Sequence, residues 1–107
     1  MAGSRLDLHN IFIDILGTKN QPASRVYFQP PATVKLEYPC IIYKRSKRKN
    51  FFSNNGLYIG MNQYLVTVVD KNPDSEIPEK IRKLPYCEFS TNFSVDNLSH
   101  DVFTLYF

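Results

Sequence analysis

Residues 63–107 decide the fold, because they read as a strand, a helix and two further strands in direct succession. The run consists of QYLVTVVD (63–70), KNPDSEIPEKIRKLP (71–85), YCEFSTNF (86–93) and DVFTLYF (101–107). The first stretch is rich in β-branched residues and is typical of a buried strand. The chain stops on the aromatic Phe107 within the last strand pattern, which predicts an end packed against a sheet or a neighbour.

The segment 71–85 predicts a helix. Its apolar residues Ile77, Ile81 and Leu84 recur at helical spacing, and Pro78 falls in the first turn, where a missing N–H is harmless. Asp74 or Ser75 is expected to cap the helix.

The two stretches after this helix alternate in polarity, which predicts strands with one buried face each. The residues expected on these faces are Cys87, Phe89, Thr91 and Phe93 in the first, and Phe103, Leu105 and Phe107 in the second. Asp96 and Asn97 are expected at the turn between the two strands.

An amphipathic helix is predicted near the N-terminus, and Ser4 or Asp7 is expected to begin it and Gly17 to end it. Its apolar face would be formed by Leu8, Ile11, Phe12, Ile15 and Leu16. Downstream, residues 26–28 (VYF) predict a short strand and residues 38–43 (YPCIIY) a buried one.

Residues 44–63 separate that buried strand from the next. A structureless loop of this length is uncommon in a compact domain, and Asn54, Asn55 and Gly56 form a tight-turn signal. We therefore expect a projecting β-hairpin arm or extended loop here. The complete expectation is one α+β domain over residues 1–107, with a small, mostly antiparallel sheet and two helices packed on one face.

Composition limits the class of protein. Hydrophobic residues make up 43% of the chain, enough for a core, and the aromatic residues are eight Phe and seven Tyr. The sequence has neither an apolar run of the ~20 residues that span a bilayer nor a secretory signal, so no membrane association is expected. Cys40 and Cys87 are expected as small buried hydrophobes in a reducing compartment, with a disulfide as the alternative.

No enzyme, cofactor or metal site is expected. Nucleophilic catalysis needs a base within hydrogen-bond reach of a Ser or Cys. Both cysteines lie in apolar runs, His9 lies on a helix, and His100 is expected near a turn. Phosphate-binding glycine motifs are absent from the sequence.

The most strongly charged segment is KRSKRKNFF, at the start of the predicted arm. The candidate partner-binding residues are Lys44, Arg45, Lys47, Arg48, Lys49, Phe51, Phe52 and Tyr58. Cations beside aromatics suit docking on an acidic protein, and they also suit phosphate contact with base stacking in a nucleic-acid-binding module. A solvated loop without a partner is the third interpretation.

Three stretches together resemble the tail terminator, or tail-completion, proteins of tailed bacteriophages. They are VYFQPP (26–31) with KLEYPCIIY (35–43), YLVTVVDKNPDSEIPEKIRKLPYC (64–87), and VDNLSHDVFTLYF (95–107). The set covers most of the chain, whereas residues 45–62 match only loosely.

This resemblance implies a structural virion protein of the tail or neck, assembled in the host cytoplasm. Such a protein would form a homo-oligomeric, hexameric ring that caps the major tail tube protein and joins it to the head-closure or connector protein. Phage DNA would make at most a passing contact in the channel. Another neck component, such as a head-closure protein, is the nearest alternative.

Overall fold

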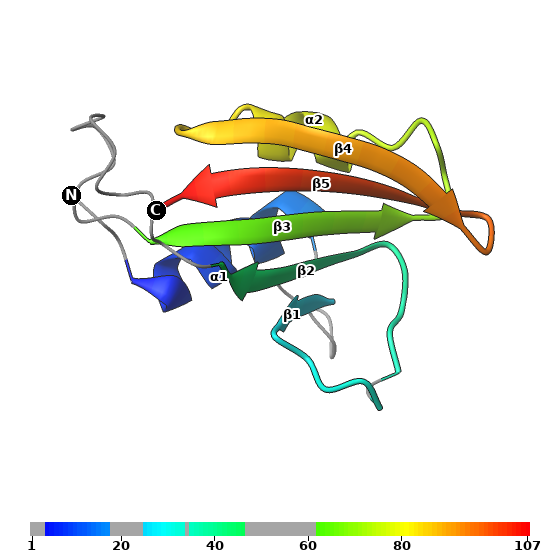
Figure 1. Ribbon diagram of the computed structural model, residues 1–107, viewed down its shortest axis with the longest axis horizontal. Helices are drawn as coiled ribbons and strands as arrows, with labels where there is room; N and C mark the ends of the chain where they lie inside the picture. Colours follow the sequence, from blue (N-terminus) through cyan, green and yellow to red (C-terminus); the bar gives the residue numbers. More distant parts are fainter. Residues whose placement is uncertain (1–3, 18–24, 34, 47–61) are drawn as a thin grey trace.

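The computed structural model describes residues 4–17, 25–33, 35–46 and 62–107. The described residues form an α+β structure with a five-stranded sheet and two helices (Figure 1). The elements are α1 (Arg5–Leu16), β1 (Val26–Phe28), β2 (Cys40–Arg45), β3 (Gln63–Asp70), α2 (Ile77–Arg82), β4 (Cys87–Val95) and β5 (Leu98–Tyr106).

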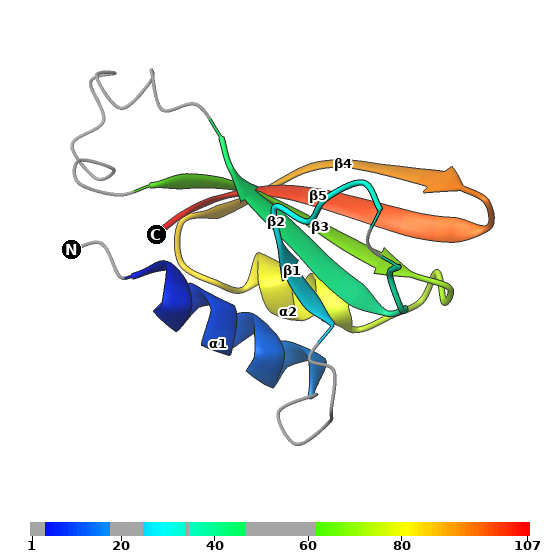
Figure 2. The same ribbon diagram turned by 90° about the horizontal axis from the view of Figure 1, so that it is seen from below.

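The sheet has the strand order β1-β2-β3-β5-β4. Strands β1 and β2 pair in parallel, and every other neighbouring pair is antiparallel. Both helices lie on one face of the sheet, as predicted (Figure 2). The opposite face carries no helix among the described residues, although Cys40 and Val69 on that face are buried.

Helix α1 forms because both of its ends are capped by its own sequence. The Ser4 side chain accepts a hydrogen bond from the backbone N–H of Asp7, and the Asp7 carboxylate accepts one from the backbone N–H of Ser4. Gly17 ends the helix in the left-handed conformation, at φ 72°, as expected. Leu8 and Phe12 are fully buried against the sheet.

The core lies between the two helices and the sheet. Its members alternate along the strands, because every second side chain points toward the helices. The buried cluster consists of Leu8, Phe12, Val26, Ile41, Tyr43, Tyr64, Val66, Val68, Ile81, Phe103 and Leu105.

Helix α2 matches the prediction except at its start. Ile81 is buried, Ile77 and Leu84 pack against the core, and a proline occupies the first turn. The residue preceding the helix is Glu76, which makes no side-chain capping bond. Ser75, one position before Glu76, bonds to the first turn of the helix instead: its Oγ accepts a hydrogen bond from the backbone N–H of Ile77 at 3.2 Å.

The prediction of one buried face for β4 is wrong. A β-bulge lies between Phe89 and Thr91, so Thr91 and Phe93 point to the opposite face from Cys87 and Phe89. Phe89 and Phe93 are 48% and 44% exposed. Strand β4 lies at the edge of the sheet, and Phe89 lies beside α2 without being buried by it.

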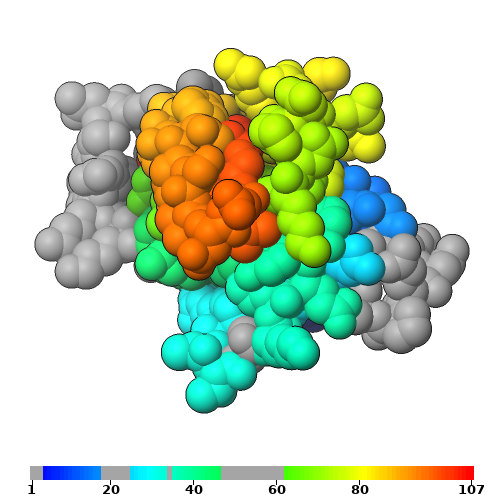
Figure 3. Space-filling model, turned by 90° about the vertical axis from the view of Figure 1, so that its right-hand side faces the viewer, coloured from blue at the N-terminus to red at the C-terminus, as the bar shows by residue number. Residues whose placement is uncertain are grey.

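The turn of the β4–β5 hairpin is confirmed. Asp96 and Asn97 both have positive φ, 53° and 64°, as a two-residue type I′ turn requires. The hairpin forms part of the surface at one end of the molecule (Figure 3). Along β5, Phe103 and Leu105 are buried and Phe107 packs against the core, as predicted.

The ends of the predicted arm are joined, although residues 47–61 lie outside the described part of the chain. Arg45 on β2 pairs with Tyr64 on β3, and the Ser46 N–H donates to the Gln63 carbonyl at 2.9 Å. Strand β2 is shifted relative to the predicted 38–43: it begins after Pro39, which has no N–H for a sheet ladder, and runs on to Arg45.

Candidate subunit-contact surfaces

Two of the eight predicted partner-binding residues, Lys44 and Arg45, lie in the described structure. Both are exposed at the end of β2. Consecutive strand residues point to opposite faces, so Arg45 projects on the helix side and Lys44 on the other. These two cations therefore do not form one patch. Lys47, Arg48, Lys49, Phe51, Phe52 and Tyr58 lie outside the described residues.

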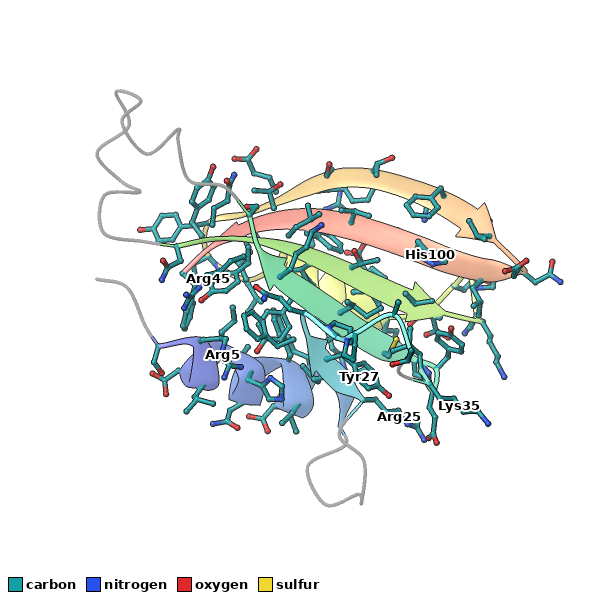
Figure 4. The ribbon with its side chains drawn as sticks, turned by 60° about the horizontal axis from the view of Figure 1, so that its bottom comes forward. Arg5, Arg25, Tyr27, Lys35, Arg45 and His100 are labelled. Atoms are coloured by element: carbon teal, nitrogen blue, oxygen red, sulfur yellow. The ribbon has the colours of Figure 1, made fainter. Side chains whose placement is uncertain are left out.

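Arg45 is exposed, but its guanidinium lies over a core aromatic ring. Its guanidinium lies 6.0 Å from the centre of the Tyr64 ring, at the outer limit of a cation–π contact. Its backbone N–H donates to the Gln29 side chain at 3.2 Å. Figure 4 shows Arg45 and Arg5 at the same end of the sheet. The base of the predicted arm is thus fixed by side-chain and backbone contacts.

An apolar cleft opens beside this base. It has a volume of about 210 Å³ and lies between α1, the α2–β4 connection and the end of β5. Its lining residues are Leu8, Ile11, Leu84, Pro85, Tyr86, Leu105, Tyr106 and Phe107. An apolar cavity of ~150 Å³ is large enough to bind benzene. The cleft therefore has the size and polarity to receive one aromatic or large aliphatic side chain.

The cleft and the predicted arm share a structural junction. Phe107, on the cleft wall, exchanges two backbone hydrogen bonds with Asn62: its N–H donates at 2.9 Å and its carbonyl accepts at 3.0 Å. Tyr106 is also fixed, since its phenol accepts from the Gln63 amide at 3.0 Å. The chain leading out of the arm is therefore hydrogen-bonded to the cleft wall itself.

Exposed apolar side chains also lie along β4, with Phe89 on the helix side of the sheet and Phe93 and Val95 on the other side. The Phe93 ring lies flat on the His100 ring, with centroids 4.7 Å apart and planes 15° apart. Apolar side chains exposed along a strand edge are a common feature of protein contacts.

His9 belongs to a polar cluster inside the helix–sheet interface. The Tyr43 phenol lies 2.7 Å from His9 Nδ1 and accepts a hydrogen bond from Arg5 at 3.2 Å. Arg5 can only donate, so the phenol hydrogen remains available to Nδ1 of a neutral imidazole. Burial, followed by the charge of Arg5, lowers the pKa of His9. The cluster attaches α1 to β2, and the lowered pKa favours the neutral form of His9.

His100 lies on β5 rather than in the turn where it was expected. Its Nδ1 lies 3.1 Å from the Leu98 carbonyl, which can only accept, so Nδ1 carries the proton. Neither described histidine makes a hydrogen bond to a Ser or Cys side chain.

Both cysteines are free thiols. Burial raises the pKa of Cys40 to about 12 and that of Cys87 to about 11. Because thiolate is the reactive form, both side chains are poor nucleophiles at neutral pH. Cys40 is fully buried as predicted, whereas Cys87 is only partly buried.

The part of the chain described here contains no group of three or more His, Cys, Asp or Glu side chains placed to hold a metal ion. Within the same residues, no helix has the length and apolar character needed to cross a bilayer.

Three features of these surfaces were missed from the sequence. The cleft combines residues from α1, the α2–β4 connection and the end of the chain, so no single motif encodes it. The β4 bulge moves Phe93 away from the face that its alternation predicts. The Tyr43–His9 contact joins residues 34 positions apart, and only the docking of α1 on β2 creates it.

Comparisons with known proteins found no match to this chain, whether among protein-family models, curated proteins or solved structures.

Proposed function

We propose that this chain is a structural protein of a tailed-phage virion, a tail terminator that works by subunit contact. Copies join head to tail into a ring, and the ring caps the major tail tube protein and meets the head-closure or connector protein. The resemblance of residues 26–43, 64–87 and 95–107 to tail terminators supplies the type of assembly. Phage DNA passes through the ring, and no catalysis is part of this function.

The apolar cleft is the observation that carries the proposed contact. Its volume of about 210 Å³ suits one aromatic side chain, and Leu8 and Leu105, which are fully or almost fully buried, form part of its lining. A head-to-tail ring requires two different surfaces on each subunit, one to insert and one to receive. The predicted arm offers aromatic residues for insertion, and the cleft offers a receptor.

The apolar character of the cleft favours this contact over nucleic-acid binding. Aromatic and aliphatic residues are enriched at protein interfaces, whereas nucleic acid requires clustered cations. At the described base of the arm, Lys44 and Arg45 project to opposite faces of β2. A single phosphate-binding stripe does not form from these two residues.

The test changes the two proposed surfaces separately. In one variant, residues 47–61 are replaced by a short Gly-Ser linker, which leaves the Ser46–Gln63 hydrogen bond in place. In the other, Ile11→Asp puts a carboxylate in the cleft wall. Leu6→Asp is the matched control, because Leu6 lies on the same helix, is 62% exposed and does not line the cleft.

We expect the wild type and Leu6→Asp to form rings on size-exclusion chromatography, and the linker and Ile11→Asp variants to elute as folded monomers. Circular dichroism establishes that each variant is folded. Normal ring formation by the folded linker variant would refute the role of the arm, and normal rings of folded Ile11→Asp would refute the role of the cleft.

A further inference from the structure

The two edges of the sheet differ in how well they are protected against pairing with another strand. β1 has three residues, is flanked by Arg25 and Gln29 in left-handed conformations, and is followed directly by Pro30 and Pro31. Short length, prolines and irregular backbone are common protections of an edge. β4 has nine residues, contains no proline and carries Glu88 as its single charge. Its bulge protects the first half, and residues 91–95 remain regular.

The hairpin register determines which backbone groups of β4 face outward. Val95 and Leu98 close the two-residue turn and therefore form a hydrogen-bonded pair. Such pairs alternate along an antiparallel ladder, so Phe93 also directs its N–H and C=O toward β5. Asn92 and Ser94 direct theirs to the free edge. Among the described residues, no strand pairs with that side of β4.

The side chains of this segment are arranged for contact on one face. Thr91, Phe93 and Val95 point to the face without helices, opposite Val102, His100 and Leu98 of β5. Phe93 and Val95 are 44% and 49% exposed. The His100 ring supports Phe93 from beneath at 4.7 Å, so little side-chain freedom is lost when a partner packs on it.

We propose that residues 91–95 form an antiparallel strand pair with the same residues of a second copy, centred on Phe93. In this register the outward groups of Asn92 meet those of Ser94 in the partner, and Thr91 lies opposite Val95. The two Phe93 residues form the non-hydrogen-bonded pair, in which side chains approach most closely. Every outward backbone group of the segment then gains a partner.

The absence of charge makes the segment compatible with a second copy as its occupant. A two-fold contact brings each residue close to its own mate, so a charged strand repels itself. Residues 91–95 (TNFSV) are uncharged. The acidic residues beyond each end do not meet in this register, because Asp96 lies opposite Ser90, and Glu88 opposite Leu98. The segment is therefore self-complementary in hydrogen bonding, shape and charge.

This contact goes beyond the proposed ring and does not rest on it. A two-fold contact closes at two copies, whereas a ring requires head-to-tail contacts. The cleft lies at the start of β4 and the pairing segment at its other end, so the two surfaces are separate. One short strand pair buries less than the ~1,200 Å² of a standard interface, so we expect a weak, concentration-dependent dimer.

The first test uses charge. The variants Thr91→Lys/Val95→Lys and Thr91→Glu/Val95→Glu each place like charges opposite one another across the two-fold axis. Sedimentation velocity up to ~500 µM should show at least tenfold weaker dimerisation for each alone, and restored dimerisation when they are mixed. A mixture no more dimeric than its components would overturn the proposed register.

The second test does not depend on total mass, so it also works if the protein forms rings. Phe93→Cys places two thiols at the centre of the proposed contact, and Leu6→Cys places one at an exposed site on α1. Under mild oxidation, the Phe93→Cys protein should form a disulfide-linked dimer at least tenfold faster than the Leu6→Cys protein. Equal cross-linking rates, or β4 pairing only with a strand of a different protein, would overturn the second copy as the partner.

Discussion

Replacing Tyr43 with Phe tests the polar cluster that attaches α1 to the sheet. The substitution removes the phenol oxygen, which accepts from Arg5 at 3.2 Å and lies 2.7 Å from His9 Nδ1. The ring itself remains, with its centroid 5.1 Å from that of Phe12 and 5.0 Å from that of Phe28. The measured change in stability therefore reports the lost hydrogen bonds and not a cavity.

The size of the expected loss in stability depends on how exposed Arg5 and His9 are. Arg5 and His9 are both half-buried, so each regains contact with water when the phenol is lost. We expect the free energy of unfolding to fall by ~1–2 kcal/mol, less than the full desolvation penalty of two orphaned groups. In urea this corresponds to a midpoint lowered by roughly 0.5–1 M with an unchanged slope.

Tyr27→Phe is the matched control. The Tyr27 phenol accepts one long, exposed hydrogen bond from the Glu37 N–H, at 3.4 Å, so its loss should change the midpoint little. Equal midpoints for the Tyr43→Phe variant and the wild type would refute the role of the cluster.

The stability of the Tyr43→Phe variant should also depend on pH differently from that of the wild type. The pKa of His9 is lowered in the folded protein by burial and by Arg5, so the unfolded chain binds its proton more readily. The stability that depends on neutral His9 is complete above the unfolded pKa of ~6.5 and is lost as the pH falls below it. A phenol that donates to Nδ1 stabilises the neutral imidazole, so in Tyr43→Phe the fall between pH 7 and pH 5 should be shallower. An identical pH dependence in both proteins would contradict the proposed donor and acceptor roles.

Two further predictions concern single sites. Gly17→Ala should lower the free energy of unfolding by ~1 kcal/mol in thermal or urea unfolding, because the residue has a left-handed φ of 72°. Steric contact does not contribute, since nothing lies within 4 Å of the added methyl group. An unchanged stability would argue against a left-handed end to α1. Burial raises the pKa of Cys87 from 9.0 to about 11, so at pH 7.5 this thiol should react with iodoacetamide roughly 100-fold more slowly in the folded protein than in urea. Cys40, with a pKa of about 12, should react more slowly still. Rapid labelling of both thiols in the native state would show that they are accessible.

The sequence predicts the elements of this fold better than their edges. Hydrophobic periodicity and capping residues act within one or two turns of chain, which is why α1 and its Ser4 and Gly17 ends are predictable. The bulge in β4 depends on how that strand pairs with β5, and the alternation of Cys87, Phe89, Thr91 and Phe93 contains no sign of it.

The candidate contact surfaces are less predictable because they are tertiary features. The aromatic ending of the chain correctly indicated a strand packed in the sheet, with Phe103 and Leu105 buried. That this end also forms the wall of a cleft depends on where α1 and the α2–β4 connection come to lie. Whether Phe51, Phe52 and Tyr58 insert into a neighbour stays a prediction of the sequence alone.

The most direct test of the proposed function is the molar mass of the wild-type protein in solution, measured by light scattering alone and with tail-tube protein. We expect a closed assembly several times the 12.4 kDa mass of one chain, which binds tube ends and stops tube growth. A protein that stays monomeric in both conditions, with tubes that lengthen as if it were absent, would contradict the assignment as a ring-forming terminator.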